Sequence, residues 1–263
     1  MSRKSWRKGK ISTTWDPVAA WYYGWVGATG STHHRRLAIP ALLKLLKPRP
    51  GEQVLDIGAG HGLLAPHITA RRALYTGVEA SPRLLARARK VASPDVRMLQ
   101  GDACRLAALP ALHASAFDAA VFLLSIQDMD PLAAVLESAA WALKPSGRLV
   151  IVMTHPCFRV PRQSGEGWDE QRKLLYRRVD RYLSPLAVPM KAYAGGRAAT
   201  WSYHRPLEDY VNGLAACGLT VDCLKEIPTY KVATSGPQAQ AQNALNREIP
   251  LFLALRARKG EQR

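Results

Sequence analysis

Residues 54–62 read Val-Leu-Asp-Ile-Gly-Ala-Gly-His-Gly, an apolar run that ends in an acid and continues into three glycines at alternate positions. Gly58, Gly60 and Gly62 can adopt positive φ angles and let a ligand approach the backbone without a Cβ in the way. A helix that begins after them offers unpaired N–H groups and the positive end of its dipole. The stretch therefore predicts a ligand-binding turn between a strand and a helix.

The spacing of these glycines separates two kinds of ligand. A dinucleotide fingerprint reads G-x-G-x-x-G, in which the third glycine packs a helix on a strand. Here that third place is Leu63, and the last glycine comes one residue earlier. Asp56 stands just before the turn, where its charge would repel a pyrophosphate and suits a ligand that carries an amine. An amine-bearing ligand is favoured, and a nicotinamide-dependent oxidoreductase is the alternative.

Further polar residues follow three later apolar runs. Glu79 ends the run 74–79, at a distance from the glycines at which an acid can hold ribose hydroxyls. Asp102 follows the run 96–100, although Gly-Asp pairs also favour plain turns. Gln127 and Asp128 follow the run 117–124. Because ligands bind at the carboxyl ends of parallel strands, we expect these side chains to face one site.

Two histidines are candidates for proton transfer. His155 follows the apolar run 149–153, and His204 lies further on in a proline-rich segment. The pKa of a histidine lies near neutrality, so either residue suits a general base that takes a proton from a hydroxyl nucleophile. A histidine that only satisfies a local carbonyl is the equally favoured reading of His155. No set of His, Cys and acidic residues has the spacing of metal ligands, and no metal is expected.

The elements that must position these residues alternate between strands and helices. Apolar runs predict seven strands, at 53–57, 74–79, 96–100, 117–124, 149–153, 219–227 and 249–255. Helices are predicted at 37–47, 61–70, 82–91 with Ser81 as its cap, 131–143 and 206–217. Asp16 is expected to cap a helix that begins at Pro17, and the stretch around Gly236 is expected to be a flexible loop. This alternation predicts an α/β domain.

Residues 15–154 resemble the class I S-adenosylmethionine-dependent methyltransferases, in particular the broad type 11 group that acts on small molecules. Asp56 to Gly62 matches the D-x-G-x-G-x-G motif of that family. The Gly-Asp-Ala at 101–103 and the Leu-Lys-Pro-Ser-Gly at 143–147 match two later motifs, with Ser146 in a glycine place. Tyr23 stands in the tyrosine place of an N-terminal "Y-D-x-W" segment, with Gly24 where an acid is common.

The resemblance implies a fold, a cofactor and a set of contacts. The fold is a doubly wound, Rossmann-like α/β domain with a mostly parallel seven-stranded sheet, an antiparallel last strand, helices on both faces and a lid insertion. The cofactor is S-adenosyl-L-methionine, held by Tyr23, Asp56, Gly58, Ala59, Gly60, Gly62, Glu79, Ala80, Asp102, Ala103 and Gln127. The reaction moves a methyl group to an O, N or C nucleophile of a small molecule, with His155 or His204 as the base where one is needed.

The charge of the chain bears on its binding partners, and its length bears on its domain organisation. The chain has 263 residues and a formal net charge of +17, which leaves nucleic acid open as a partner and an RNA methyltransferase as an alternative function. A protein that keeps the fold and binds the cofactor without catalysis is a further alternative. We expect a basic flexible tail at 1–14 and one methyltransferase domain at 15–263, with a substrate lid at about 155–205.

The cellular location follows from the cysteines and from the apolar runs. The four cysteines form no C-x-x-C pair, which argues against a disulfide framework and suits a reducing compartment. The first ten residues are basic and lead into no apolar segment, so no secretory signal is expected. No apolar run approaches the ~20 residues that span a bilayer. We therefore expect a cytoplasmic protein, and the sequence does not indicate an oligomeric state.

Overall fold

A seven-stranded sheet forms the centre of the protein in the computed structural model, which describes residues 15–191 and 199–261. The predicted basic tail at 1–14 lies outside the described residues. The strand order is β3-β2-β1-β4-β5-β11-β10. The strands are β1 (Gln53–Ile57), β2 (Leu74–Glu79), β3 (Val96–Gln100), β4 (Phe117–Leu123), β5 (Leu143–Thr154), β10 (Leu219–Ile227) and β11 (Phe252–Lys259).

The directions of the strands confirm the predicted topology. Strands β1 to β5 run parallel to one another. Strand β11 runs antiparallel to both of its neighbours, β5 and β10. The last strand in the chain is therefore the antiparallel one. The fold is the predicted doubly wound α/β sheet, and the carboxyl ends of its parallel strands lie at one edge, where such folds bind ligands.

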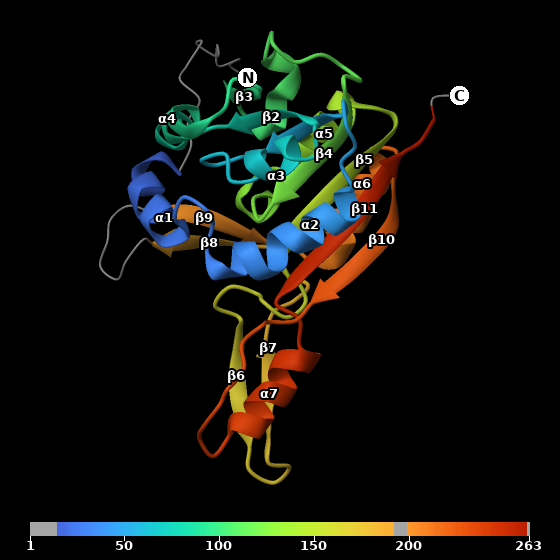
Figure 1. The fold of residues 1–263 in the computed structure, drawn as a ribbon. Helices are drawn as coiled ribbons and strands as arrows, with labels where there is room; N and C mark the ends of the chain where they lie inside the picture. Colours follow the sequence, from blue (N-terminus) through green and yellow to red (C-terminus); the bar gives the residue numbers. More distant parts are fainter. Residues whose placement is uncertain (1–14, 192–198, 262–263) are drawn as a thin grey trace, which may run out of the picture.

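Helices cover both faces of the sheet (Figure 1). Their bounds are α1 (Ala19–Val26), α2 (Ile39–Leu46), α3 (Ala65–Thr69), α4 (Pro82–Val91), α5 (Leu132–Ala142), α6 (Leu207–Ala216) and α7 (Ala239–Glu248). Short helical turns lie at η1 (Asp16–Val18), η2 (His34–Ala38), η3 (Ala103–Ala108) and η4 (Ile126–Asp128). The helix predicted at 61–70 is shorter than expected, because residues 61–64 form turns before α3 begins.

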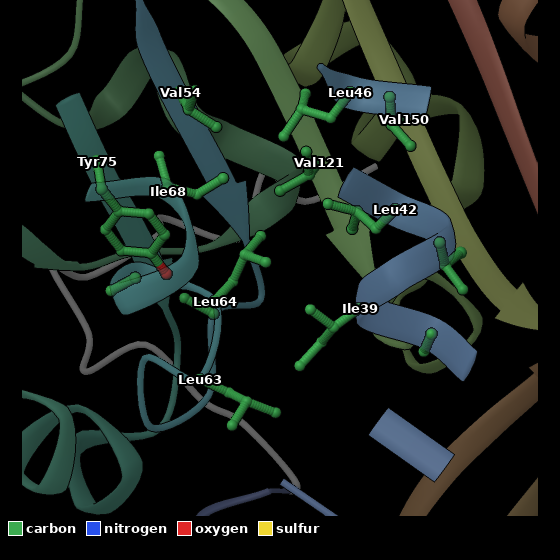
Figure 2. Close-up of a cluster of buried hydrophobic side chains, with 14 of the residues drawn as sticks. Ile39, Leu42, Leu46, Val54, Leu63, Leu64, Ile68, Tyr75, Val121 and Val150 are labelled. Carbon is green, nitrogen blue, oxygen red and sulfur yellow. The ribbon is translucent and has the colours of Figure 1, made fainter. Parts of the chain in front are cut away.

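Alternate residues of the strands face two separate cores. Val121 of β4 lies in the core under α2 and α3, and Phe122 lies in the core under α5 and α6. Figure 2 shows Leu42 and Leu46 of α2 beside Val121 in the first core. Both faces are buried, which explains why these strands read as continuous apolar runs in the sequence.

Asp16 differs from its predicted role. It lies inside η1, and the residue in the cap position, Trp15, makes no side-chain cap. Its Oδ1 instead accepts hydrogen bonds from the Ser81 hydroxyl at 2.8 Å and from the Arg83 backbone N–H at 3.0 Å. The first N–H groups of a helix have no acceptor within the helix. Asp16, from a distant part of the chain, supplies an acceptor to one such N–H of α4, that of Arg83. Ser81 caps the same helix as predicted, accepting from the Leu84 N–H at 3.3 Å.

The segment after β10 also differs from its prediction. The residues around Gly236 form the predicted loop, but the Ala and Gln residues that follow them, predicted as part of the same loop, form α7. Alanine and glutamine are good helix formers, and the side chain of Asn243 joins the helix to Ala233 through two hydrogen bonds of 2.8 and 2.9 Å. The last strand begins three residues later than predicted, at Phe252, because β11 pairs along the whole of β10 from Ile227↔Phe252 to Leu219↔Lys259.

Residues 155–191 and 199–205 form two antiparallel hairpins in place of a sixth βα unit. One hairpin consists of β6 (Ser164–Asp169) and β7 (Leu174–Val179), and it extends from the sheet together with α7 (Figure 1). The other consists of β8 (Leu186–Lys191) and β9 (Ala199–His204), and β9 contacts η1 and η4. The second hairpin thus lies against the two segments that flank the carboxyl edge of the sheet.

Candidate active site

A cavity of about 250 Å³ opens at the carboxyl ends of the parallel strands. Its walls come from the glycine turn, from the ends of β2 and β4, from the start of η3 and from the N-terminal segment. The polar and aromatic residues that line it are Trp15, Tyr22, Glu79, Asp102, Cys104, Ser125, Asp128, Asp130 and Tyr203. Gly58, Gly60, Ala80 and Ala103 contribute backbone to the same wall.

The glycine turn lets the chain pass close to this cavity. Gly58 has a φ of +75°, and a Cβ there would lie 2.5 Å from Cε of Met129. Gly60 has a φ of +58°, and its N–H donates to Oε2 of Glu79 at 2.8 Å. Both positions therefore require glycine. Gly62 and Ala59 do not line the cavity, and a Cβ on Gly62 would instead meet Ala88 of α4 at 3.5 Å.

Glu79 lies at the end of β2, as the sequence predicted, and its carboxylate reaches the cavity wall. Oε1 accepts from the Ser81 N–H at 2.7 Å, and Oε2 accepts from the Gly60 N–H. Burial raises the pKa of Glu79, and these N–H groups act against that rise. The carboxylate is held in place while its remaining lone pairs are open to the hydroxyls of a ligand.

Asp56 lies behind the glycine turn and does not line the cavity. Its side chain is buried, and Oδ2 accepts from the Tyr75 hydroxyl at 2.7 Å. Burial raises the pKa of Asp56 to about 7. Oδ1 is shielded from solvent and has no hydrogen-bond partner among the described residues. A direct contact of Asp56 with a ligand amine stays a prediction.

Two aromatic residues of the N-terminal segment cover the cavity. Trp15 and Tyr22 both line it, and their rings meet edge to face with centroids 5.2 Å apart. Tyr23, the residue expected from the sequence, turns away and packs under the guanidinium of Arg87 at 4.2 Å. Successive residues on a helix point about 100° apart, so only one of two adjacent tyrosines can face the cavity.

Asp102 caps a helical turn and also lines the cavity. Its Oδ1 accepts from the Cys104 N–H at 2.9 Å and so caps η3. It also lines the cavity together with Ala103, next to the apolar side chains of Val78 and Leu84. A carboxylate beside an apolar slot suits a flat ring that carries an amino group.

The acids after β4 form the other end of the cavity. The Asp128 carboxyl is hydrogen-bonded by Ser202 of β9, and burial raises its pKa well above the usual range. Oδ1 of Asp128 is shielded from solvent and has no partner in the described part of the chain. Asp130 is paired with the buried Arg205 at 2.7 Å. Gln127 does not line the cavity, and its Nε2 donates to the Leu124 carbonyl at 2.7 Å.

Neither predicted base lies on the cavity wall. His155 is buried at the end of β5, where its Nε2 lies 2.9 Å from Oε1 of Glu226 and its Nδ1 accepts from the Cys157 N–H at 3.2 Å. Burial lowers the pKa of His155, although Glu226 acts in the opposite direction. Nε2 of His204 bonds the Tyr182 carbonyl at 2.6 Å. General-base roles for both histidines stay predictions that this geometry does not favour.

The charge of the cavity is opposite to that of the protein. Four of the side chains that line it carry carboxyl groups, and none of its described lining residues is Lys, Arg or His. The whole chain has a formal net charge of +17. S-Adenosylmethionine, which the resemblance implies, carries a sulfonium and an ammonium group, and the cavity fits both. Within residues 15–191 and 199–261, no group of three metal-ligating side chains is placed to hold a metal ion.

Sequence comparisons identify the same stretch that forms this site. Residues 55–151 match the family model of the methyltransferase domain. A demethylmenaquinone methyltransferase of Tropheryma whipplei (strain Twist) is 34% identical over 129 residues, which are 47% of this chain and 49% of that protein. A ubiquinone biosynthesis O-methyltransferase of Xylella fastidiosa is 26% identical over 56% of this chain and 60% of that protein. The chain thus spans about half the length of the demethylmenaquinone methyltransferase.

Solved structures extend the similarity to most of the chain. An S-adenosylmethionine-dependent methyltransferase from Mesorhizobium loti superposes with a TM-score of 0.66 at 25% identity, over 84% of this chain and 96% of that one. The matched family is a methyltransferase domain rather than a nicotinamide-dependent oxidoreductase, and the cofactor of this family is S-adenosylmethionine. The protein carries a class I S-adenosylmethionine-dependent methyltransferase domain, as the sequence motifs predicted.

Proposed function

We propose that the protein transfers a methyl group from S-adenosylmethionine to a small organic molecule. The observation that carries this proposal is the acid-lined cavity at the carboxyl edge of the sheet, where Glu79 is held by the N–H groups of Gly60 and Ser81. When bound, the cofactor supplies a methyl group on a positively charged sulfur. The protein supplies binding, alignment and exclusion of water.

Each wall of the cavity has a role in this proposal. Glu79 accepts hydrogen bonds from the ribose hydroxyls, and Asp102 accepts one from the amino group of the adenine. Gly58 and Gly60 let the rest of the cofactor lie close to the backbone. Trp15 and Tyr22 close the cavity from the N-terminal side and keep water from the reacting atoms.

The two relatives described above support a small acceptor over a nucleic acid. Both are named for the methylation of quinone-type small molecules. The cavity is lined by carboxyl groups, which suits neither the phosphates of RNA nor another anionic acceptor. The net charge of +17 is the observation that favours RNA, and a steep salt dependence of RNA binding would restore that alternative.

The organisation and location of the protein belong to the same proposal. We assign residues 15–263 to a single catalytic domain, in which the inserted segment 155–205 acts as the lid over the acceptor. Tyr203 of β9 lines the cavity, which supports this role for the second hairpin. No described helix is long and apolar enough to cross a membrane. We place the protein in the cytoplasm because its four cysteines are free thiols.

Calorimetric titration with S-adenosylhomocysteine, beside NADH, tests the cofactor assignment. Wild-type protein should bind the first ligand alone, and Glu79→Ala should weaken that binding by about 1.5–3 kcal/mol, because two charge-assisted hydrogen bonds are lost. Glu170→Ala is the matched control, since that glutamate is exposed on the β6–β7 hairpin, where it pairs with Lys173 and does not line the cavity. Binding of NADH, or no binding of S-adenosylhomocysteine, would remove the basis of the proposal.

A further inference from the structure

One carboxyl group in the cavity takes no part in the ribose and adenine contacts proposed above. Glu79 and Asp102 belong to the ribose and adenine positions, and Asp130 is neutralised by Arg205 at 2.7 Å. Asp128 remains. Its Oδ1 faces no donor in the described structure and is shielded from solvent. A shielded oxygen without a partner is costly unless a ligand supplies the missing donor.

The surroundings of Asp128 are aromatic and fixed. Tyr22 comes from α1, and Tyr203 comes from β9 on the inserted hairpin; both line the cavity with Asp128. The charge of Asp128 acts on both hydroxyls, raising the pKa of Tyr22 and of Tyr203 in addition to the larger effect of burial. The Ser202 hydroxyl bonds the Asp128 carboxyl and leaves Oδ1 free. A cavity lined by a carboxyl group and by aromatic side chains suits an organic cation.

Resting on the methyltransferase function proposed above, we propose that the methyl acceptor is a small amine and that Oδ1 of Asp128 binds its nitrogen. An amine that enters as an ammonium ion completes the hydrogen bonding of Asp128 in a cavity that Tyr22 and Tyr203 also line. An anionic acceptor would meet the unpaired carboxyl group of Asp128, and none of the described lining residues is Lys, Arg or His. A neutral alcohol would use the hydrogen bond but not the charge.

The reaction at this site balances in protons and electrons. The ammonium group gives one proton to the Asp128 carboxylate, and the neutral nitrogen then has a free lone pair. That lone pair forms the bond to the methyl carbon while the carbon–sulfur bond breaks and its electron pair stays on sulfur. The methylated amine leaves as a cation, and the proton on Asp128 passes to solvent when the cavity opens. Asp128 is therefore a catalytic residue in this proposal.

The test is the binding of size-matched probes to the complex with S-adenosylhomocysteine. The panel holds arylalkyl amines, alcohols and carboxylates, such as phenethylamine, phenethyl alcohol and 3-phenylpropionate. We expect the amines to bind at least about tenfold more tightly than the matched alcohols and carboxylates. Asp128→Asn should reduce amine affinity by about tenfold or more and leave the affinity for S-adenosylhomocysteine within about twofold. Asp95→Asn, an exposed acid after α4, is the control.

The outcomes separate this proposal from the methyltransferase function itself. Failure of wild-type protein to bind S-adenosylhomocysteine would overturn both. Binding of S-adenosylhomocysteine without any amine preference would overturn the amine proposal alone, and this comparison needs no variant. Loss of S-adenosylhomocysteine binding in a folded Asp128→Asn variant would assign Asp128 to the cofactor and also overturn it. Folding is checked by the thermal midpoint of each variant.

Discussion

The carboxylate of Asp16 accepts a hydrogen bond from the Ser81 hydroxyl at 2.8 Å, across 65 residues of chain. Ser81 is the cap of α4 and directly follows the segment that holds Glu79 at the cavity. This contact anchors the N-terminal segment next to the site, so that Trp15 and Tyr22 lie over the cavity. Glu79 and the N-terminal segment that carries Trp15 and Tyr22 are therefore joined through hydrogen bonds to Ser81.

Substitution of Asp16 should loosen this cover. Asp16→Ala removes the acceptor for the Ser81 hydroxyl and the Arg83 N–H, and we expect the free energy of unfolding to fall by about 0.5–2 kcal/mol, as for a lost helix cap. The affinity for S-adenosylhomocysteine should fall as well, because Trp15 and Tyr22 lose their anchor. Chemical denaturation and calorimetry measure the two effects. An unchanged affinity in Asp16→Ala would show that the cover does not depend on this contact.

Two glycine-to-alanine substitutions should change the stability of the protein in opposite directions. Gly58→Ala places a Cβ at a φ of +75° and 2.5 Å from Cε of Met129, so we expect a loss of about 1–3 kcal/mol in stability and a loss of cofactor binding. Gly24→Ala adds a Cβ to the helix α1 with no atom within 4 Å, and it should raise stability by about 0.5–1 kcal/mol. Thermal denaturation of both variants distinguishes them. Equal changes in the thermal midpoint of the two variants would contradict the argument that Gly58, unlike Gly24, is required by its φ angle and its close contact.

The stability of the protein should depend on pH through Asp56. The folded state holds this carboxyl with a pKa of about 7, above its ordinary value of 3.8, so between these pH values the folded state binds more protons than the unfolded state. The free energy of unfolding therefore falls as the pH rises from about 4 to about 7. Tyr75 and Glu79 are the titratable neighbours that face Asp56.

Asp56→Asn isolates this contribution. The amide oxygen can still accept from the Tyr75 hydroxyl, but no charge forms in the core. Relative to the variant, wild-type protein should lose on the order of a few kcal/mol between pH 5 and pH 8, at about 1.4 kcal/mol for each unit of pKa shift. Urea denaturation at both pH values gives the comparison. Parallel pH profiles for the two proteins would contradict the assignment.

His155 should contribute to stability rather than to catalysis. It is buried, and both of its ring nitrogens are engaged, by Glu226 and by the Cys157 N–H. We expect His155→Phe to cost about 1–3 kcal/mol in the free energy of unfolding, because the Cys157 N–H loses its acceptor. Methyl transfer to an accepted amine should stay within about twofold of wild type when assayed below the thermal midpoint. A loss of about a hundredfold in kcat with an intact fold would restore the general-base role.

Local signals in the sequence were enough to predict the sheet and one wall of the cavity. Continuous apolar runs predicted the buried parallel strands, and the glycine turn with Glu79 predicted residues that line the cavity at their carboxyl ends. The sequence predicted that Tyr23 lines the site, whereas the neighbouring Tyr22 lines the cavity. A run of adjacent aromatic residues does not indicate which of them faces inward.

Contacts between distant segments could not be predicted in this way. Tyr203 reaches the cavity only because β9 folds back onto η4, and no local pattern contains that contact. The position of Asp128 after β4 predicted that it faces the site. Its hydrogen bond with Ser202 of the inserted segment could not be predicted from local sequence. His155 follows a strand of the right kind, yet its ring bonds Glu226 on β10 and does not line the cavity.

The position of β11 has a consequence for the order in which the sheet can be completed during synthesis. Residues 252–259 lie between β5 and β10, which precede them in the chain, so neither strand has its partner on that side until the ribosome has released this segment. Until then β5 presents an open hydrogen-bonding edge to other nascent chains. The free edge of β5 is therefore covered only after residues 252–259 have been synthesised. A chain that stops before residue 252 should aggregate rather than form a smaller enzyme.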